Sequence, residues 1–202
     1  MASIKSIIQT ASIMALLGLN PAMAANHITR LVPNAQKVGS ARMHVMIWDI
    51  YDADLYAPNG NWSAEKPYAL QLTYLRNLDG QKIADRSIKE IREQGFNDET
   101  TLLSWQIRMK NIFPDVKQGD VLIGIYTSDK ETVFYDAEKE IGRIQDPEFG
   151  EKFFGIWLNE KTSEPEIRTA LLGNAPHKKE KVVYDVQNRE NTIRYGGDRA
   201  HD

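Results

Sequence analysis

The chain contains no cysteine among its 202 residues. This absence excludes disulfide bonds, cysteine nucleophiles and thiolate metal sites, and it also excludes a bacterial lipoprotein anchor, which needs a cysteine after the cleavage point. An excess of positive charge is missing too, because 25 lysine and arginine residues face 28 acidic residues, for a formal net charge of −3. Without a clustered basic block, nucleic acid is not an expected partner.

Patterns for metal, phosphate or nucleophile chemistry are also lacking. The four histidines are scattered, and none has a partner at metal-ligand spacing. The glycines form no phosphate-binding loop between a strand and a helix, and no serine sits in a nucleophile elbow. The acidic group Asp49, Asp52 and Asp54 lacks the glycine and glutamate of a calcium loop. The residue patterns therefore predict no metal, no cofactor and no catalytic residue.

The chain has one long apolar run, at residues 7–19. Lys5 precedes the run, and the small residues Ala22 and Ala24 follow it at the spacing of a signal-peptide cleavage site. The run is too short for a membrane-spanning helix, so no stable membrane span is expected. We predict a secretory signal peptide over residues 1–24, cleaved after Ala24. The bacterial periplasm is the simplest destination, with secretion beyond it left open.

Hydrophobic periodicity predicts strands and helices in groups. The expected strands cover residues 42–56, 68–76, 121–127, 132–135 and 141–144. The expected helices cover residues 82–94, 98–113, 146–157 and 163–172, with N-terminal caps at Asp79, Asp98 and Asp146 and a capping box from Ser163 to Glu166. Charged residues, Glu90 among them, are expected on the outer face of helix 82–94. Because the helices come in pairs, we predict an α+β fold with a large antiparallel sheet.

The predicted domain covers residues 25–173, and residues 25–41 form a lead-in to its first strong strand signal. Residues 174–202 are charged and low in apolar residues. We predict a C-terminal tail there, with one edge strand at 182–184 as its best structural signal and disorder beyond it.

The strand predicted at residues 68–76 carries a charged residue on its apolar face. Alternation places Arg76 at the end of the face shared by Tyr68, Leu70, Leu72 and Tyr74. An arginine on the core-facing side can hold a carboxylate in a bidentate pair. The alternative is that its stem packs on the sheet edge while its guanidinium reaches water.

Aromatic residues form the other prominent group, and most simply they fill one hydrophobic core. Alternatively they wall a cavity between the sheet and the helices, with Arg76 and a tyrosine as its polar anchor, since small-ligand sites are mostly apolar with few polar groups. The candidate ligand-binding residues are Arg76, Tyr74, Tyr126, Trp105, Phe154 and Trp157.

Three segments in the second half of the chain read IFPDVKQGDVLIGIY, FYDAEKEIGRIQDPEFGEKFFGIWL and TSEPEIRTALLG. Together with WDIYDADLYAPNG and YALQLTYLRNLDGQKIA upstream, they resemble the bacterial, exported branch of the chalcone isomerase-like family over roughly residues 38–173. The resemblance implies an open-faced β-sandwich, a large antiparallel sheet with a helical layer on one face. This architecture agrees with the order of elements expected from periodicity.

The resemblance implies two kinds of function. The family includes chalcone isomerases, which close a flavanone ring by adding a phenolate to an enone, and non-catalytic members that bind fatty acids in the same cleft. The polar positions of the catalytic members correspond here to Met46, Ile83, Glu90 and a position near Phe149, and the early arginine has no counterpart. A site that lacks these hydrogen-bond donors does not readily stabilise a developing enolate.

The leading hypothesis is therefore a non-catalytic exported protein that binds a fatty acid or a similar apolar carboxylate between the sheet and the helices. One alternative is an isomerase or lyase that acts on chalcone-like phenolic enones. Another is a structural or partner-binding domain with a filled core and no ligand. The sequence leaves the ligand's identity and the oligomeric state open.

Overall fold

Six antiparallel strands make up one sheet, and their order in space is their order along the chain. The computed structural model describes residues 27–174. The strands are β1 (Ala35–Val45), β2 (Trp48–Pro58), β3 (Tyr68–Tyr74), β4 (Val121–Tyr126), β5 (Thr132–Tyr135) and β6 (Glu140–Ile144). A short helical segment at residues 27–31 precedes β1. The longer helices are α2 (Gly80–Glu93), α3 (Glu99–Ile112), α4 (Pro147–Leu158) and α5 (Pro165–Leu171). The predicted signal peptide and the predicted edge strand at 182–184 lie outside the described residues.

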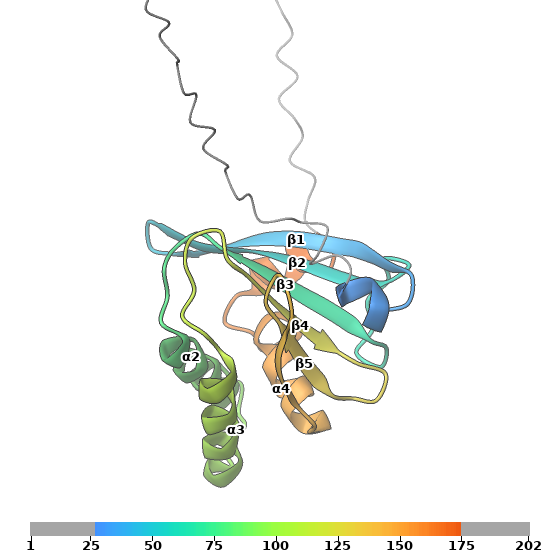
Figure 1. Ribbon diagram of the computed structural model, residues 1–202. Coiled ribbons are helices and arrows are strands. Elements are labelled where there is room, and N and C mark those ends of the chain that lie inside the picture. Colours follow the sequence, from blue (N-terminus) through green and yellow to red (C-terminus); the bar gives the residue numbers. More distant parts are fainter. Residues whose placement is uncertain (1–26, 175–202) are drawn as a thin grey trace, which may run out of the picture.

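The labelled helices α2, α3 and α4 gather on one side of the sheet, as Figure 1 shows. The principal hydrophobic core lies between these two layers and includes the fully buried Trp105, Phe149 and Phe154. A smaller apolar cluster covers part of the opposite face, where Ile28 and Val32 pack on strands β3, β4 and β5. The predicted α+β fold with a large antiparallel sheet is confirmed.

The strand predicted over residues 42–56 is instead two strands joined by a tight turn. Strands β1 and β2 are each 11 residues long and pair with each other, with Val45 opposite Trp48. The apolar run continues through the turn, so the sequence there has none of the glycine, asparagine or proline that usually marks a hairpin. Met46 adopts a φ of 56°, a left-handed conformation that costs a residue other than glycine about 1–2 kcal/mol.

Three of the predicted helix starts are confirmed by their caps. Asp79, Asp98 and Asp146 each accept hydrogen bonds from free backbone amides in the first turns of α2, α3 and α4. Asp146 also accepts a hydrogen bond of 2.9 Å from Nε1 of Trp105. The same carboxylate therefore begins α4 and holds α3 against it.

The predicted capping box from Ser163 to Glu166 is wrong. Helix α5 begins after Glu164, whose side chain makes no capping hydrogen bond. The Ser163 hydroxyl donates instead to Oε2 of Glu90 on α2, at 2.8 Å. A tertiary partner has taken the hydroxyl that local spacing assigned to the helix end.

Helix α4 packs closely on the sheet through a glycine. A Cβ atom at Gly150 would lie 2.6 Å from a ring carbon of Tyr126 and 2.8 Å from Oγ1 of Thr132. A side chain at this position would therefore push α4 away from β4 and β5. Gly155 on the same helix has more room, because its Cβ would meet only the end of the Gln94 side chain, at 3.3 Å, and Cβ of Asn159, at 3.5 Å.

We expect Gly150→Ala to lower the free energy of unfolding by about 1–3 kcal/mol, because overpacking forces α4 or the Tyr126 ring to move. Gly155→Ala is the matched control. It should be neutral or stabilise the fold by up to about 1 kcal/mol, since alanine is the better helix former. Urea unfolding followed by circular dichroism measures both variants, and equal stabilities would contradict this packing.

Candidate functional site

A cavity of about 330 Å³ lies between the sheet and helices α2 and α4. Most of its wall is apolar. The sheet contributes Met43, Val45, Ile50, Leu70, Leu72 and Leu122, and the helices contribute Ile83, Phe153, Phe154, Ile156 and Trp157. The volume falls at the lower end of the range for small-molecule sites, about 300–1,000 Å³. The cavity is therefore large enough for a small apolar ligand.

Strand β3 supplies one wall of the cavity and its most buried phenol. Leu70, Leu72 and Tyr74 all face the helices, because side chains alternate along a strand. The Tyr74 ring is buried, and its hydroxyl group makes no hydrogen bond to a described residue. Burial raises the pKa of Tyr74, so the phenol stays protonated at neutral pH and can donate to a ligand.

A second phenol lies beside the first. Tyr51 of β2 packs edge-on against Tyr74, with 6.0 Å between the ring centroids. Its hydroxyl oxygen accepts a hydrogen bond of 2.9 Å from Nε1 of Trp157 on α4. Burial raises the pKa of Tyr51 to about 12, although the bond from Trp157 acts in the opposite direction. This bond ties the sheet to α4 beside the cavity and fixes the indole ring in its wall.

Helix α2 brings charged groups to the cavity. Glu90 is only 4% exposed, and it forms an ion pair with Arg86 and accepts the hydrogen bond from Ser163. A buried carboxylate requires such partners, because removal from water is otherwise costly. Lys82 also lines the cavity and forms no ion pair with any residue in the range 27–174. The expectation that Glu90 lies on the outer face of α2 is wrong, whereas Arg86 and Lys82 are exposed.

Three of the six predicted ligand-binding residues line the cavity, namely Tyr74, Phe154 and Trp157. Trp105 and Tyr126 lie outside its lining and serve as core residues. The Trp105 ring stacks on Phe96, with 4.9 Å between centroids. The Tyr126 ring packs at a tilt against Tyr68, with 5.4 Å between centroids.

Arg76 also lies outside the cavity lining. Strand β3 ends at Tyr74, so the alternation that would have kept Arg76 on the core-facing side stops before it. The guanidinium carbon lies 4.3 Å from the ring centroid of Trp48 instead. The expectation that Arg76 faces the cavity is therefore wrong, and Lys82 takes its place as a cation available to a ligand.

Sequence reasoning missed Tyr51, Lys82 and Ser163. Tyr51 and Ser163 meet their partners only through tertiary contacts, 106 and 73 residues apart in the chain. Lys82 could have been found, because it is adjacent to Ile83 and four residues before Arg86 on the helix that covers the cavity. Its position at the border of the apolar stripe is the signal.

The positions that the family resemblance matches to catalytic residues are Met46, Ile83, Glu90 and one near Phe149, and they do not form one polar site. Ile83 and Glu90 line the cavity. Met46 stands at the exposed end of the β1–β2 hairpin, and Phe149 is fully buried in the core. Ile83, Met46 and Phe149 also offer no side-chain hydrogen-bond donor, and Glu90 is held by Arg86 and Ser163.

Two further features are absent from residues 27–174. No helix in this range is long and apolar enough to cross a bilayer. In the same range, no three side chains of His, Cys, Asp or Glu are grouped so that they could hold a metal ion.

Comparisons with known proteins agree with the architecture. The family described as chalcone isomerase-like matches residues 37–173. An uncharacterised protein of Haemophilus influenzae is 29% identical over 139 residues, which span 68% of this chain and 68% of that protein. A fatty-acid binding protein of Arabidopsis thaliana has a similar structure, with a TM-score of 0.56 and 10% identity over 71% of this chain and 89% of that one. At this identity the structural likeness shows the fold.

We expect Tyr51→Phe to lower the free energy of unfolding by about 1–3 kcal/mol, because Nε1 of Trp157 would lose its acceptor while remaining largely buried. Tyr126→Phe is the control, since the Tyr126 hydroxyl has no hydrogen-bond partner among the described residues. It should change stability by less than about 0.5 kcal/mol. Urea unfolding at neutral pH measures both, and a neutral Tyr51→Phe would show that the bond to Trp157 contributes nothing.

Proposed function

Because the chain belongs to the chalcone isomerase-like family, we propose that it is a non-catalytic protein that binds a fatty acid or a similar apolar carboxylate. The observation that carries the proposal is the cavity of about 330 Å³, whose wall is mostly apolar. Its polar residues are two phenols and a group on and beside α2, namely Asp79, Lys82, Arg86, Ser87, Glu90, Ser163 and Glu164. An Arabidopsis thaliana fatty-acid binding protein with the same fold supports it, because it shows that this architecture can hold such a ligand.

The size and character of the cavity favour an unbranched apolar chain. Each methylene group moved from water into an apolar wall contributes about 0.8 kcal/mol to binding. Leu70, Leu72 and Phe154 supply such a wall on two sides. The gain per methylene should therefore continue until the chain fills the cavity, and longer chains should gain nothing more.

The charged residues suggest where the carboxylate lies. Asp79, Glu90 and Glu164 line the cavity and would repel it, although Asp79 already accepts a hydrogen bond from the backbone amide of Lys82. Arg86 is already engaged with Glu90. Lys82 has no such partner, and Ile83 beside it packs against the cluster that contains Tyr74. We therefore assign the carboxylate to the side of the cavity near Lys82, within reach of a protonated phenol.

The predicted signal peptide extends the proposal to a cellular compartment. Residues 1–24 combine a basic residue, an apolar run and a cleavage site. We propose that the protein binds its ligand in the bacterial periplasm. Mass spectrometry of the chain recovered from the periplasm of expressing cells would test this, because cleavage after Ala24 predicts Ala25 as the first residue.

A variant that fills the cavity tests the proposed function. We expect Leu72→Trp to weaken the binding of medium- and long-chain fatty acids by at least about tenfold, because the indole would occupy space that the ligand needs. Leu72→Met is the volume-conserving control and should bind within about threefold of the wild type. Titration calorimetry across a series of chain lengths measures the affinities.

Three outcomes would overturn the proposed function. The wild-type chain could fail to bind any fatty acid of the series and yield no lipid on solvent extraction. Leu72→Trp could bind as tightly as the wild type while keeping its circular dichroism spectrum, which would place the ligand elsewhere. Consumption of a chalcone by the wild-type chain, followed by absorbance, would show that the protein is an isomerase.

The assignment of the carboxylate makes a separate prediction. Lys82→Ala should weaken fatty-acid binding by about two- to fivefold, the effect of an ion pair near the surface. Binding of the fatty alcohol with the same chain should not change. Lys89→Ala on the same helix is the control, because Lys89 pairs with Glu93 and does not line the cavity. Equal losses for the acid and the alcohol would contradict the assignment.

A further inference from the structure

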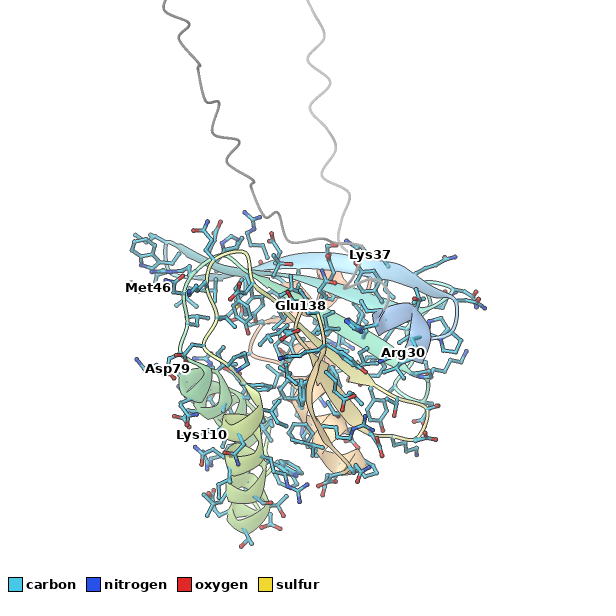
Figure 2. The ribbon with its side chains drawn as sticks, in the orientation of Figure 1. Arg30, Lys37, Met46, Asp79, Lys110 and Glu138 are labelled. Atoms are coloured by element: carbon cyan, nitrogen blue, oxygen red, sulfur yellow. The ribbon has the colours of Figure 1, made fainter. Side chains whose placement is uncertain are left out.

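The turn between β1 and β2 exposes an unusual amount of apolar surface. We call residues Val45–Trp48 the hairpin tip. Met46 is 92% exposed and Ile47 is 84% exposed, and about half of Trp48 is also open to water. Figure 2 shows Met46 at the free end of the hairpin, away from the helices. Adjacent exposed apolar side chains on a projecting turn indicate contact with another apolar medium.

The backbone of the hairpin tip supports the same reading. Met46 has a positive φ, which a two-residue hairpin turn normally gives to glycine or asparagine. A polar Gly-Asn sequence would suit both the backbone and the solvent. The chain instead places Met46 and Ile47 there, against both local preferences. A function of these two side chains explains why the turn carries them.

One unpaired positive charge lies beside the hairpin tip. The Arg76 guanidinium lies over the Trp48 ring and forms no ion pair within residues 27–174. The other arginine of this hairpin, Arg42, is paired with Asp49 and Asp52. A tryptophan beside an unpaired arginine suits the boundary between acyl chains and anionic headgroups, because the indole prefers that depth and the guanidinium is attracted to phosphate.

The hairpin tip is continuous with the cavity. Val45 belongs to both, and Ile50 on the adjoining strand also lines the cavity. An apolar chain leaving a bilayer at the hairpin tip would therefore meet apolar side chains on its way inward. A protein partner fits less well, because a stable interface buries about 800 Å² on each side, which is far more than four residues present.

We propose that the hairpin tip inserts into the surface of a lipid bilayer that contains anionic lipids, and that the cavity exchanges its ligand there. The cargo in this inference rests on the proposed function, whereas the docking itself does not. Shallow insertion of three apolar side chains gives a weak and reversible association, which suits a protein that visits a membrane to load or unload.

Flotation with vesicles tests the docking. The protein is used as it is recovered from exporting cells, so that all variants share one N-terminus. The probes are vesicles of phosphatidylcholine alone and of phosphatidylcholine with phosphatidylglycerol. We expect the wild-type chain to float with both and more strongly with the anionic vesicles. Arg76→Gln should remove the difference between the two compositions, because it removes the unpaired charge.

The decisive variant is Met46→Gly with Ile47→Asn. It should reduce vesicle binding by about tenfold or more, since two apolar side chains are lost from the inserted turn. It should also raise the melting temperature, because glycine relieves the positive φ of Met46. The control is Leu103→Ser with Ile107→Ser, which removes two apolar side chains of α3 that are also more than half exposed. The control should bind vesicles as the wild type does.

The cargo is tested separately from the docking. Fatty-acid affinity in vesicle-free solution should be the same for Met46→Gly/Ile47→Asn and the wild type, whereas transfer of a fluorescent fatty acid from vesicles should be slower for the variant. Vesicle binding without fatty-acid binding would refute the proposed function and leave the docking standing. Absence of vesicle binding by the wild type, or equal binding by the hairpin-tip variant, would overturn the docking. If the α3 control lost as much vesicle binding as the hairpin-tip variant, this would also overturn the docking.

Discussion

The close approach of helix α4 to the sheet is the constraint on which the rest of the structure depends. Gly150 brings the helix against Tyr126 and Thr132, where no Cβ atom fits. Asp146 fixes the start of the same helix and holds Trp105 of α3. With α4 set firmly on β4 and β5, helix α2 faces strand β3 across the cavity. The tight packing of α4 on β4 and β5 thus leaves the cavity open between α2 and β3.

The wall of the cavity is mostly apolar, but it also contains polar groups. The position of each polar group follows from the free-energy cost of removing it from water. Burial keeps the phenols of Tyr51 and Tyr74 neutral, since it raises the pKa of each. Glu90 is buried beside two partners, since Arg86 forms an ion pair with one of its oxygens and Ser163 donates a hydrogen bond to the other. Lys82 stands at the exposed border, where an unpaired ammonium group is solvated at little cost. The interior therefore offers two neutral phenols beside one paired carboxylate, and the border offers an unpaired positive charge.

Much of this fold could be predicted from the sequence, because its signals are local. Aspartates before apolar stripes marked three helix starts, and alternation along β3 placed Leu70, Leu72 and Tyr74 on one face. The incorrect predictions also have physical reasons. The β1–β2 hairpin was not predicted, because its turn consists of apolar residues. Ser163 was misread because its partner, Glu90, is 73 residues distant in the chain. Arg76 was misplaced because alternation was carried past the end of the strand.

The misread positions coincide with the places where local rules are broken, and these places adjoin the cavity. Met46 has a left-handed backbone in a solvent-exposed turn, where glycine or asparagine is usual. Glu90 is a buried carboxylate on a helix whose charged residues otherwise face water. Arg76 is stacked on Trp48 beyond the end of its strand. The left-handed Met46 and the buried Glu90 each cost stability on their own, whereas Arg76 gains a cation–π contact with Trp48. Glu90 lines the cavity, and Met46 follows Val45, which also lines it. The proposed ligand binding and the proposed membrane docking would together account for these departures. Under those two proposals, the hairpin tip and the cavity act on the same ligand.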